Sequence, residues 1–163
     1  MKIGVVSDTH NNLYSVKKII NIFNEECVDY VIHTGDITNI KTLESFSSLK
    51  ADLFGVFGNN DRIEPGLVEK AIELGFTFSE PPLQITLRKK IIAIFHEPES
   101  IEKYIDENQH IDLVLHGHTH RFREENYRNT IIFNPGESAG FIKGGNAIGI
   151  VELDSITTRR IFF

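Results

Sequence analysis

The chain has 163 residues, a formal net charge of −6 and 40% apolar residues, a composition typical of one soluble globular domain with its own core. The acidic balance argues against broad, unspecific nucleic-acid binding, which needs an excess of Lys and Arg, and no apolar run approaches the ~18 residues of a membrane span. Residues 1–6 reach the polar pair Ser7-Asp8 too early for a signal peptide, so we expect a cytoplasmic protein.

In the first half of the chain, short apolar runs alternate with segments of helical periodicity. We expect strands at 3–6, 30–33 and 53–57 and helices at 13–26, 41–49 and 65–74. The single cysteine, Cys27, excludes an internal disulfide and a thiolate metal cage, and we expect it to pack in the core as a small hydrophobe. This alternation predicts parallel βα units whose polar loops lie at the carboxyl ends of the strands, where ligands bind in such sheets.

The second half of the chain is richer in strands. We expect a β-hairpin at 83–87 and 91–95, a helix at 99–108 and further strands at 111–115, 130–133, 147–153 and 157–162. Residues 134–137 read as a turn. The pattern predicts an α/β (α+β) domain spanning residues 1–163, with two sheets packed face to face and helices outside.

Five polar clusters each follow one of the apolar strands. They are Asp8-Thr9-His10, Gly35-Asp36, Gly58-Asn59-Asn60-Asp61, His96 and Gly117-His118-Thr119-His120. Each cluster alone is read more simply as a solvated loop or turn, because Gly, Asn and Asp are the usual turn residues. Their joint occurrence at one edge of the sheets favours a binding site.

The chemistry of these clusters points to metal. Carboxylate, imidazole and amide donors without a thiolate suit borderline divalent ions such as Mn, Fe, Co, Ni or Zn. Seven such donors exceed the three or four protein ligands of a single catalytic zinc and are about right for two metals that share a carboxylate. His118 and His120 would point to the same face of an extended backbone and could reach one metal or two adjacent ones.

The order of these clusters resembles that of the calcineurin-like metallophosphoesterase family, and more narrowly that of its small archaeal and bacterial phosphodiesterases. The matching motifs are, in order, Asp-x-His, Gly-Asp, Gly-Asn-Asn-Asp, His and Gly-His-Thr-His. The resemblance implies a four-layer αββα sandwich of two mixed β-sheets flanked by helices. It also implies that Asp8, His10 and His120 hold one metal, that Asn59, His96 and His118 hold a second, and that Asp36 bridges the two.

The resemblance further implies an enzyme with two divalent metal ions, manganese first among Mn, Fe, Ni, Co and Zn. A hydroxide bridging the ions would attack phosphorus in line with the leaving oxygen of a small phosphodiester. The buried-strand histidines His33 and His116 match no ligand position, and we interpret them as supporting residues. Strands in the C-terminal part of the chain could pair at their edges, and a homodimer is expected.

The chain departs from the family pattern at two positions. Many members have a catalytic histidine where this chain has Asn60, with the following residue, here Asp61, orienting it. An amide cannot act as a general acid near neutral pH, so we expect a preference for diesters and good leaving groups. Glu97 stands where the family has Gly and could narrow the pocket, repel an anion or bind metal, and Arg62 is a candidate phosphate contact.

Two other functions are weighed against the phosphodiesterase. The retromer-associated branch of this fold is a protein-binding scaffold with an eroded metal site. Such erosion does not predict seven filled ligand positions, which favours the enzyme. The second alternative is a phosphomonoesterase or nucleotide phosphatase, which Asn60 disfavours.

Overall fold

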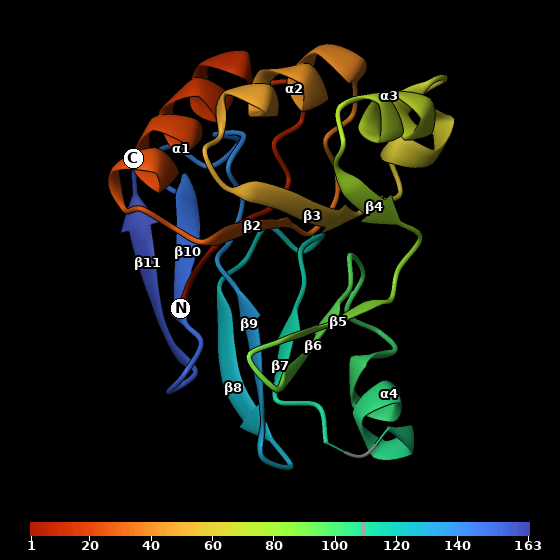
Figure 1. Ribbon diagram of the computed structural model, residues 1–163, viewed down its shortest axis with the longest axis vertical. Helices are drawn as coiled ribbons and strands as arrows, with labels where there is room; N and C mark the ends of the chain where they lie inside the picture. The colour runs from red at the N-terminus through yellow and green to blue at the C-terminus, as the bar shows by residue number, and fades with distance from the viewer. Residues whose placement is uncertain (109) are drawn as a thin grey trace.

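The computed structural model of the protein describes residues 1–108 and 110–163. Two mixed β-sheets lie against each other, with helices on the outer side of each (Figure 1). Three helices, α1 to α3, cover the first sheet, and α4 lies against the second. The predicted fold, two mixed sheets flanked by helices, is confirmed.

The first sheet has the strand order β11-β10-β1-β2-β3-β4. Its strands are β1 (Lys2–Val6), β2 (Tyr30–His33), β3 (Asp52–Val56), β4 (Thr77–Ser79), β10 (Ala147–Glu152) and β11 (Thr157–Phe162). Strands β1, β2, β3 and β4 run parallel, as the alternation in the sequence predicts for the first three. Their carboxyl ends therefore deliver the loops after β1, β2 and β3 to one edge of the sheet.

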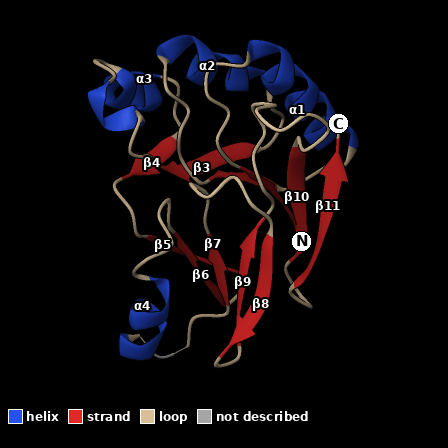
Figure 2. Ribbon diagram, turned by 180° about the vertical axis from the view of Figure 1, so that it is seen from behind, coloured by secondary structure: helices blue, strands red, loops and turns tan. Residues whose placement is uncertain are grey.

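The second sheet has the order β5-β6-β7-β9-β8. Its strands are β5 (Leu83–Leu87), β6 (Lys90–Ile94), β7 (Leu113–Leu115), β8 (Arg123–Tyr127) and β9 (Thr130–Asn134). Strands β6, β7 and β9 are parallel, and β5 and β8 close the two edges as antiparallel hairpin partners (Figure 2). The loops after β6 and β7 thus leave this sheet on the side that faces the loops of the first.

The helices are α1 (Leu13–Glu25), α2 (Ile40–Ser45), α3 (Leu67–Glu73) and α4 (Ile101–Glu107). Asn12 caps α1, because its side chain accepts a hydrogen bond from the amide of Ser15 at 3.1 Å. Asn39 caps α2 in the same way through Thr42 at 2.9 Å. Among the described residues, none of these helices has the length and apolarity needed to cross a membrane.

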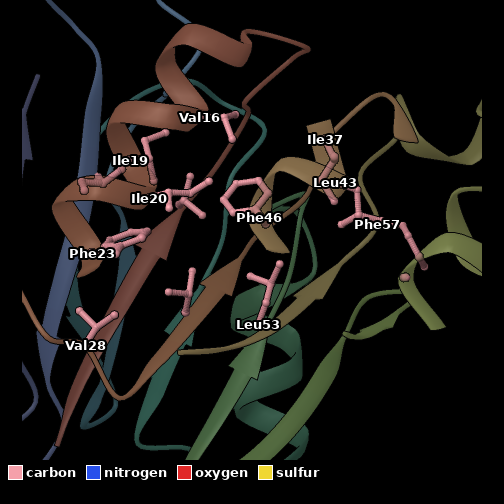
Figure 3. Packing of buried hydrophobic residues seen from close by; sticks show 14 of the residues in the cluster. Val16, Ile19, Ile20, Phe23, Val28, Ile37, Leu43, Phe46, Leu53 and Phe57 are labelled. Atoms are coloured by element: carbon pink, nitrogen blue, oxygen red, sulfur yellow. The ribbon is translucent and has the colours of Figure 1, made fainter. Parts of the chain in front are cut away.

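Three apolar clusters hold the layers together. Residues on one face of α1 pack with α2 and the outer side of β2 and β3, as Val16, Ile20 and Leu43 illustrate (Figure 3). A second cluster lies between the sheets, and a third joins α4 to the second sheet. The spacing of apolar residues along 13–25 is therefore what fixes α1 against the sheet.

The structure corrects one expectation and adds two strands that were not predicted. Cys27 is exposed, because α1 ends at Glu25 and Cys27 turns away with a left-handed backbone (φ 52°). Strand β4 was not predicted, since three residues carry little periodic signal. Strand β8 was not predicted either, because its sequence, Arg-Glu-Glu-Asn-Tyr, lacks the apolar alternation of a half-buried strand.

Candidate metal centre

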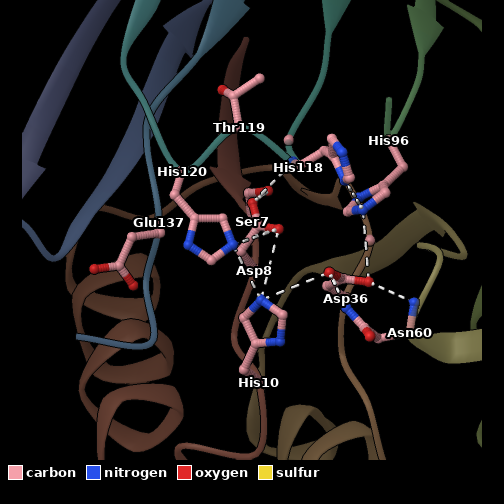
Figure 4. A network of polar contacts seen from close by, with 12 residues as sticks. Ser7, Asp8, His10, Asp36, Asn60, His96, His118, Thr119, His120 and Glu137 are labelled. Carbon is pink, nitrogen blue, oxygen red and sulfur yellow. Dashed lines mark hydrogen bonds and ion pairs between the residues drawn. The ribbon is translucent and has the colours of Figure 1, made fainter. Parts of the chain in front are cut away.

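The predicted ligands come together where the loops of both sheets meet (Figure 4). Five of the seven sit on backbone with positive φ, between 39° and 67°. These five are Asp8, His10, Asp36, His118 and His120. Left-handed backbone costs about 1–2 kcal/mol for a residue other than glycine. Such strain gathers at functional sites, where the surrounding structure enforces it.

Two glycines let the loops approach this closely. A Cβ atom added to Gly117 would collide with the Ser7 hydroxyl, and one added to Gly58 would collide with the Asp36 carboxylate. Glycine is therefore required at both positions for the strand-end loops to converge on shared side chains.

The first group of ligand atoms contains Asp8, His10 and His120. The Nε2 atoms of the two histidines lie 3.2 Å apart, and His120 Nε2 lies 3.5 Å from Asp8 Oδ1. These three side chains place their ligand atoms within 4.8 Å of one another. Two ligand atoms that share one metal at about 2.1 Å are about 3.0–3.4 Å apart, so the spacing suits a shared ion.

The second group contains Asn59, His96 and His118. Asn59 Oδ1 lies 2.9 Å from His96 Nε2 and 3.1 Å from His118 Nδ1, and these two nitrogens are 3.3 Å apart. His96 Nδ1 donates to the backbone oxygen of Thr34 at 2.8 Å, which turns Nε2 toward the group. Metal-binding histidines are commonly oriented by such a bond.

Asp36 lies between the groups. Its Oδ2 is 3.6 Å from His10 Nε2, and its Oδ1 is 3.5 Å from His96 Nε2. The side chain is almost fully buried. Burial alone would raise the pKa of Asp36, but hydrogen bonds from His96 and Asn60 hold it well below its usual range. Asp36 is therefore an anion that both groups can share.

One buried oxygen of the cluster makes no hydrogen bond within the described part of the chain. Asp8 Oδ2 accepts from the Ser7 hydroxyl and from the amide of His118, whereas Asp8 Oδ1 is buried and has no hydrogen-bond partner among residues 1–108 and 110–163. A buried carboxylate oxygen without a partner is costly. It faces the nitrogens of His10 and His120, so a divalent cation would satisfy all three atoms, and the donor set fits such an ion.

Comparison with known proteins identifies the family. The calcineurin-like phosphoesterase superfamily domain matches residues 1–155. The chain belongs to this superfamily. Phosphodiesterase MJ0936 of Methanocaldococcus jannaschii is 35% identical over 99% of this chain and 98% of its own length. Phosphodiesterase YfcE of Escherichia coli K12 is 26% identical over 95% of this chain and 88% of its own.

Solved structures agree with this assignment. The structure of an archaeal phosphodiesterase matches with a TM-score of 0.90 and 31% identity over 100% of both chains. The predicted family is confirmed. Membership implies divalent metal ions, and the two groups of ligand atoms are where this calcineurin-like phosphoesterase could hold them.

The histidine pair of the phosphoesterase does not follow the predicted geometry. His118 and His120 are not extended, because both have left-handed backbone (φ 67° and 56°). The turn sends His118 to Asn59 and His96, and His120 to His10 and Asp8. The two side chains are therefore divided between the groups by a turn rather than by strand periodicity.

His33 and His116 support the centre from outside, as interpreted from the sequence. His33 is fully buried, contacts the Thr9 hydroxyl through Nε2 at 3.1 Å and accepts from the amide of Gly35 through Nδ1. Burial lowers the pKa of His33 to about 3 and that of His116 to about 4. Both imidazoles are therefore neutral at physiological pH.

Asn60 and Asp61 have different surroundings. The Asn60 side chain donates to Asp36 Oδ2 at 2.8 Å and lies at the edge of the centre (Figure 4). The Asp61 carboxylate is buried and accepts from three backbone amides, those of Asp36, Thr38 and Gly58. Burial raises the pKa of Asp61. Its contacts fix the loops after β2 and β3, which is a positioning role.

Arg62 and Glu97 contact each other. Arg62 Nη2 lies 3.8 Å from Glu97 Oε2, and Arg62 Nε lies 3.3 Å from Glu80 Oε2. Glu97 is not one of the acidic and histidine side chains whose ligand atoms cluster in the described part of the chain. Of the roles considered for Glu97, its position therefore favours shaping of the pocket. The positive charge of Arg62 is partly balanced by the carboxylates of Glu80 and Glu97.

A loop that begins at the end of the predicted turn 134–137 forms one wall of the centre, and its course beyond Glu137 was not predicted. Glu137 is buried, and its carboxylate accepts from the amides of Gly140 and Ile142 at 2.7 and 3.1 Å. These bonds hold the Phe141 ring parallel to His120, with centroids 5.5 Å apart. Glycines at 140, 144 and 145 were the available signal, but a glycine-rich stretch does not reveal what it packs against.

Proposed function

We propose that this calcineurin-like phosphoesterase hydrolyses small phosphodiesters with two divalent metal ions. One observation carries the proposal: two groups of nitrogen and oxygen ligand atoms share Asp36, and the buried Asp8 Oδ1 within them has no hydrogen-bond partner among the described residues. Two relatives that cover the whole chain or nearly all of it are named phosphodiesterases, which supports the same reaction.

The proposed roles follow the two groups. One ion would be held by the first group, Asp8, His10 and His120, and the other by the second group, Asn59, His96 and His118. Asp36 would bind both ions. When bound, the ions supply Lewis acidity that polarises a phosphoryl oxygen and activates a water for in-line attack on phosphorus. We propose manganese as the first candidate. Fe, Ni, Co and Zn are alternatives, because nitrogen and oxygen donors without thiolate accept all of these ions.

Asn60 decides which esters react well. Its Nδ2 lies beside Asp36 and can also donate a hydrogen bond to a phosphoryl oxygen. An amide has no proton to give to a leaving alkoxide at neutral pH, so leaving groups of low pKa are favoured. A diester also brings one negative charge rather than two toward the acidic side chains of the centre. Aryl diesters are therefore the expected test substrates.

The first test combines metal content and turnover. The purified protein should carry transition metal, and added Mn²⁺ should support hydrolysis of bis(p-nitrophenyl) phosphate. Asp36→Asn should lower kcat/KM by 100-fold or more, because both groups lose their shared anion. Asp52→Asn, a matched change at the exposed start of β3, should have no effect. Absence of both metal and hydrolysis in the wild type would overturn the proposal.

The monoesterase alternative is tested at Asn60. Asn60→His supplies a side chain that can protonate a leaving group, so hydrolysis of p-nitrophenyl phosphate should rise relative to that of the diester. A several-fold change in this ratio is expected. If the ratio stays the same, our account of Asn60 fails, although the metal centre could still be correct.

The scaffold alternative makes the opposite prediction for metal. A binding platform would tolerate loss of Asp36 or His96 without losing its partner, whereas the strained backbone of five ligand residues favours a retained chemical role. A homodimer stays part of the proposal. Sedimentation of the purified protein measures its molar mass in solution and so distinguishes a monomer from a dimer.

A further inference from the structure

A groove adjoins the second ligand group of this proposed phosphodiesterase. The groove has a volume of about 360 Å³, and His118 lies in its wall. Because His118 also belongs to the second ligand group, the groove opens directly onto the place where a phosphoryl group would be held. A phosphodiester has two substituents, so the one that is retained needs a subsite adjoining the metal centre.

The groove has an apolar wall. Pro81 and Phe95 line it, and Phe95 is held by an edge contact to Tyr104 with ring centroids 5.2 Å apart. Phe95 is only 3% exposed, so it is part of the fixed core and not a mobile flap. Pro82, which also lines the groove and is exposed, and half-buried Pro81 supply the apolar surface against which an alkyl chain can lie.

The rim of the groove is acidic. Glu97 and Glu99 line it together with Arg62, and Glu80 contacts the guanidinium of Arg62 from outside. One positive charge thus stands among three negative charges. The Arg62 guanidinium is engaged by both Glu80 and Glu97, so it offers little net attraction to a further anion. An ammonium group would meet carboxylates here, whereas a carboxylate or second phosphate would be repelled.

We infer that this groove binds the retained substituent of the diester and selects one that is neutral or cationic, such as an amino alcohol, over one that carries a further negative charge. The inference rests on the proposed phosphodiesterase function and adds the class of substrate. Glu97, one of the two departures from the family pattern, is then a specificity residue.

The test uses three p-nitrophenyl phosphodiesters that share one leaving group and differ in the other substituent. The substituents are choline, n-propanol and 3-hydroxypropanoate, which are cationic, neutral and anionic. With Mn²⁺ at low salt, we expect the choline ester to have about tenfold higher kcat/KM than the anionic ester. Exposed charge pairs change binding by about two- to fivefold each, which sets the size of this effect.

The variants move this ratio in opposite directions. Glu97→Gln with Glu99→Gln should lower the choline-to-anion ratio about fivefold or more, and Arg62→Gln should raise it. The matched control, Glu102→Gln with Glu107→Gln, removes two carboxylates of α4 outside the groove and should leave the ratio unchanged. Using a ratio with a shared leaving group cancels changes in the chemical step.

The outcomes separate the two proposals. Hydrolysis of all three esters at equal rates, with no response to the groove variants, would overturn the inference and leave the phosphodiesterase standing. A ratio that responds equally to the α4 control would also overturn it, because the effect would then come from overall charge. If none of the three esters is hydrolysed, the proposed function fails and the inference fails with it.

Discussion

The Asp61 carboxylate holds the backbone of Asp36. Asp61 Oδ2 accepts from the amide of Asp36 at 2.9 Å and from the amide of Gly58 at 2.7 Å. One buried side chain thus joins the loops after β2 and β3, which carry Asp36 and Asn59. The positions of two candidate metal ligands therefore depend on a residue that is not among the proposed ligands.

Replacement of Asp61 should loosen both loops. In Asp61→Asn, the amide group can keep only one acceptor oxygen and turns its own N–H groups toward backbone donors. Leaving such a buried donor unsatisfied costs about 1–3 kcal/mol. Urea unfolding of the metal-free protein measures this loss, and Mn²⁺ titration should show weaker binding. Asp52→Asn is the control, and equal stability of both variants would contradict the positioning role.

The unpaired Asp8 Oδ1 predicts how stability depends on metal. Mn²⁺ at 100 times its Kd should raise the free energy of unfolding by about 2.7 kcal/mol per site, because the ion binds the folded chain. Asp8→Asn should remove most of this gain. Without metal the same variant should lose little stability, since its amide can donate to His120 Nε2, which lies 3.5 Å from Oδ1, whereas Oδ1 itself makes no hydrogen bond within the described part of the chain. Thermal unfolding with EDTA and with Mn²⁺ measures both effects.

Because His33 is buried, we expect the metal-free protein to lose stability toward unfolding as the pH falls below 6.5. Burial lowers the pKa of His33 to about 3, while the unfolded chain has a value of about 6.5. The unfolded state therefore takes up a proton first. The contribution of His33 is complete above pH 6.5 and is lost by about 1.4 kcal/mol per pH unit below it.

The comparison for His33 is His33→Gln, which lacks this titration. The stability difference between wild type and variant should shrink by about 2 kcal/mol from pH 6.5 to pH 5. His110→Gln, at an exposed position, is the control. If the stability difference between the wild type and His33→Gln does not change with pH, His33 is not the group that makes stability depend on pH.

Phe141 should slow the exchange of metal. Its ring stacks on His120 and lies 5.1 Å from the His10 ring, so it covers one side of the first ligand group. Phe141→Ala, and Glu137→Ala through loss of the loop contacts, should speed release of Mn²⁺ to EDTA several-fold. Ile72→Ala, an exposed apolar change on α3, should leave the release rate unaltered. Equal release rates in all variants would show that this loop does not slow the release of Mn²⁺.

The sequence by itself determined the order of the βα units and the place of the polar clusters. Apolar runs such as Ile3–Val6 form buried strands, and the parallel strands of the first half end at a common edge, so the first three clusters were expected to meet there. The resemblance of the motifs then indicated the family, which the comparisons confirmed. The assignment of individual ligands, the cytoplasmic location and the homodimer stay predictions.

Tertiary structure alone decided the rest. Strand β8 exists because β9 offers it a pairing edge, and its own residues carry no apolar alternation. The left-handed turn at His118 and His120 is enforced by buried neighbours against local preference, so strand periodicity could not predict it. The Arg62–Glu97 contact and the stacking of Phe141 on His120 join residues distant in the chain. Such contacts are set by packing between elements, which local sequence does not encode.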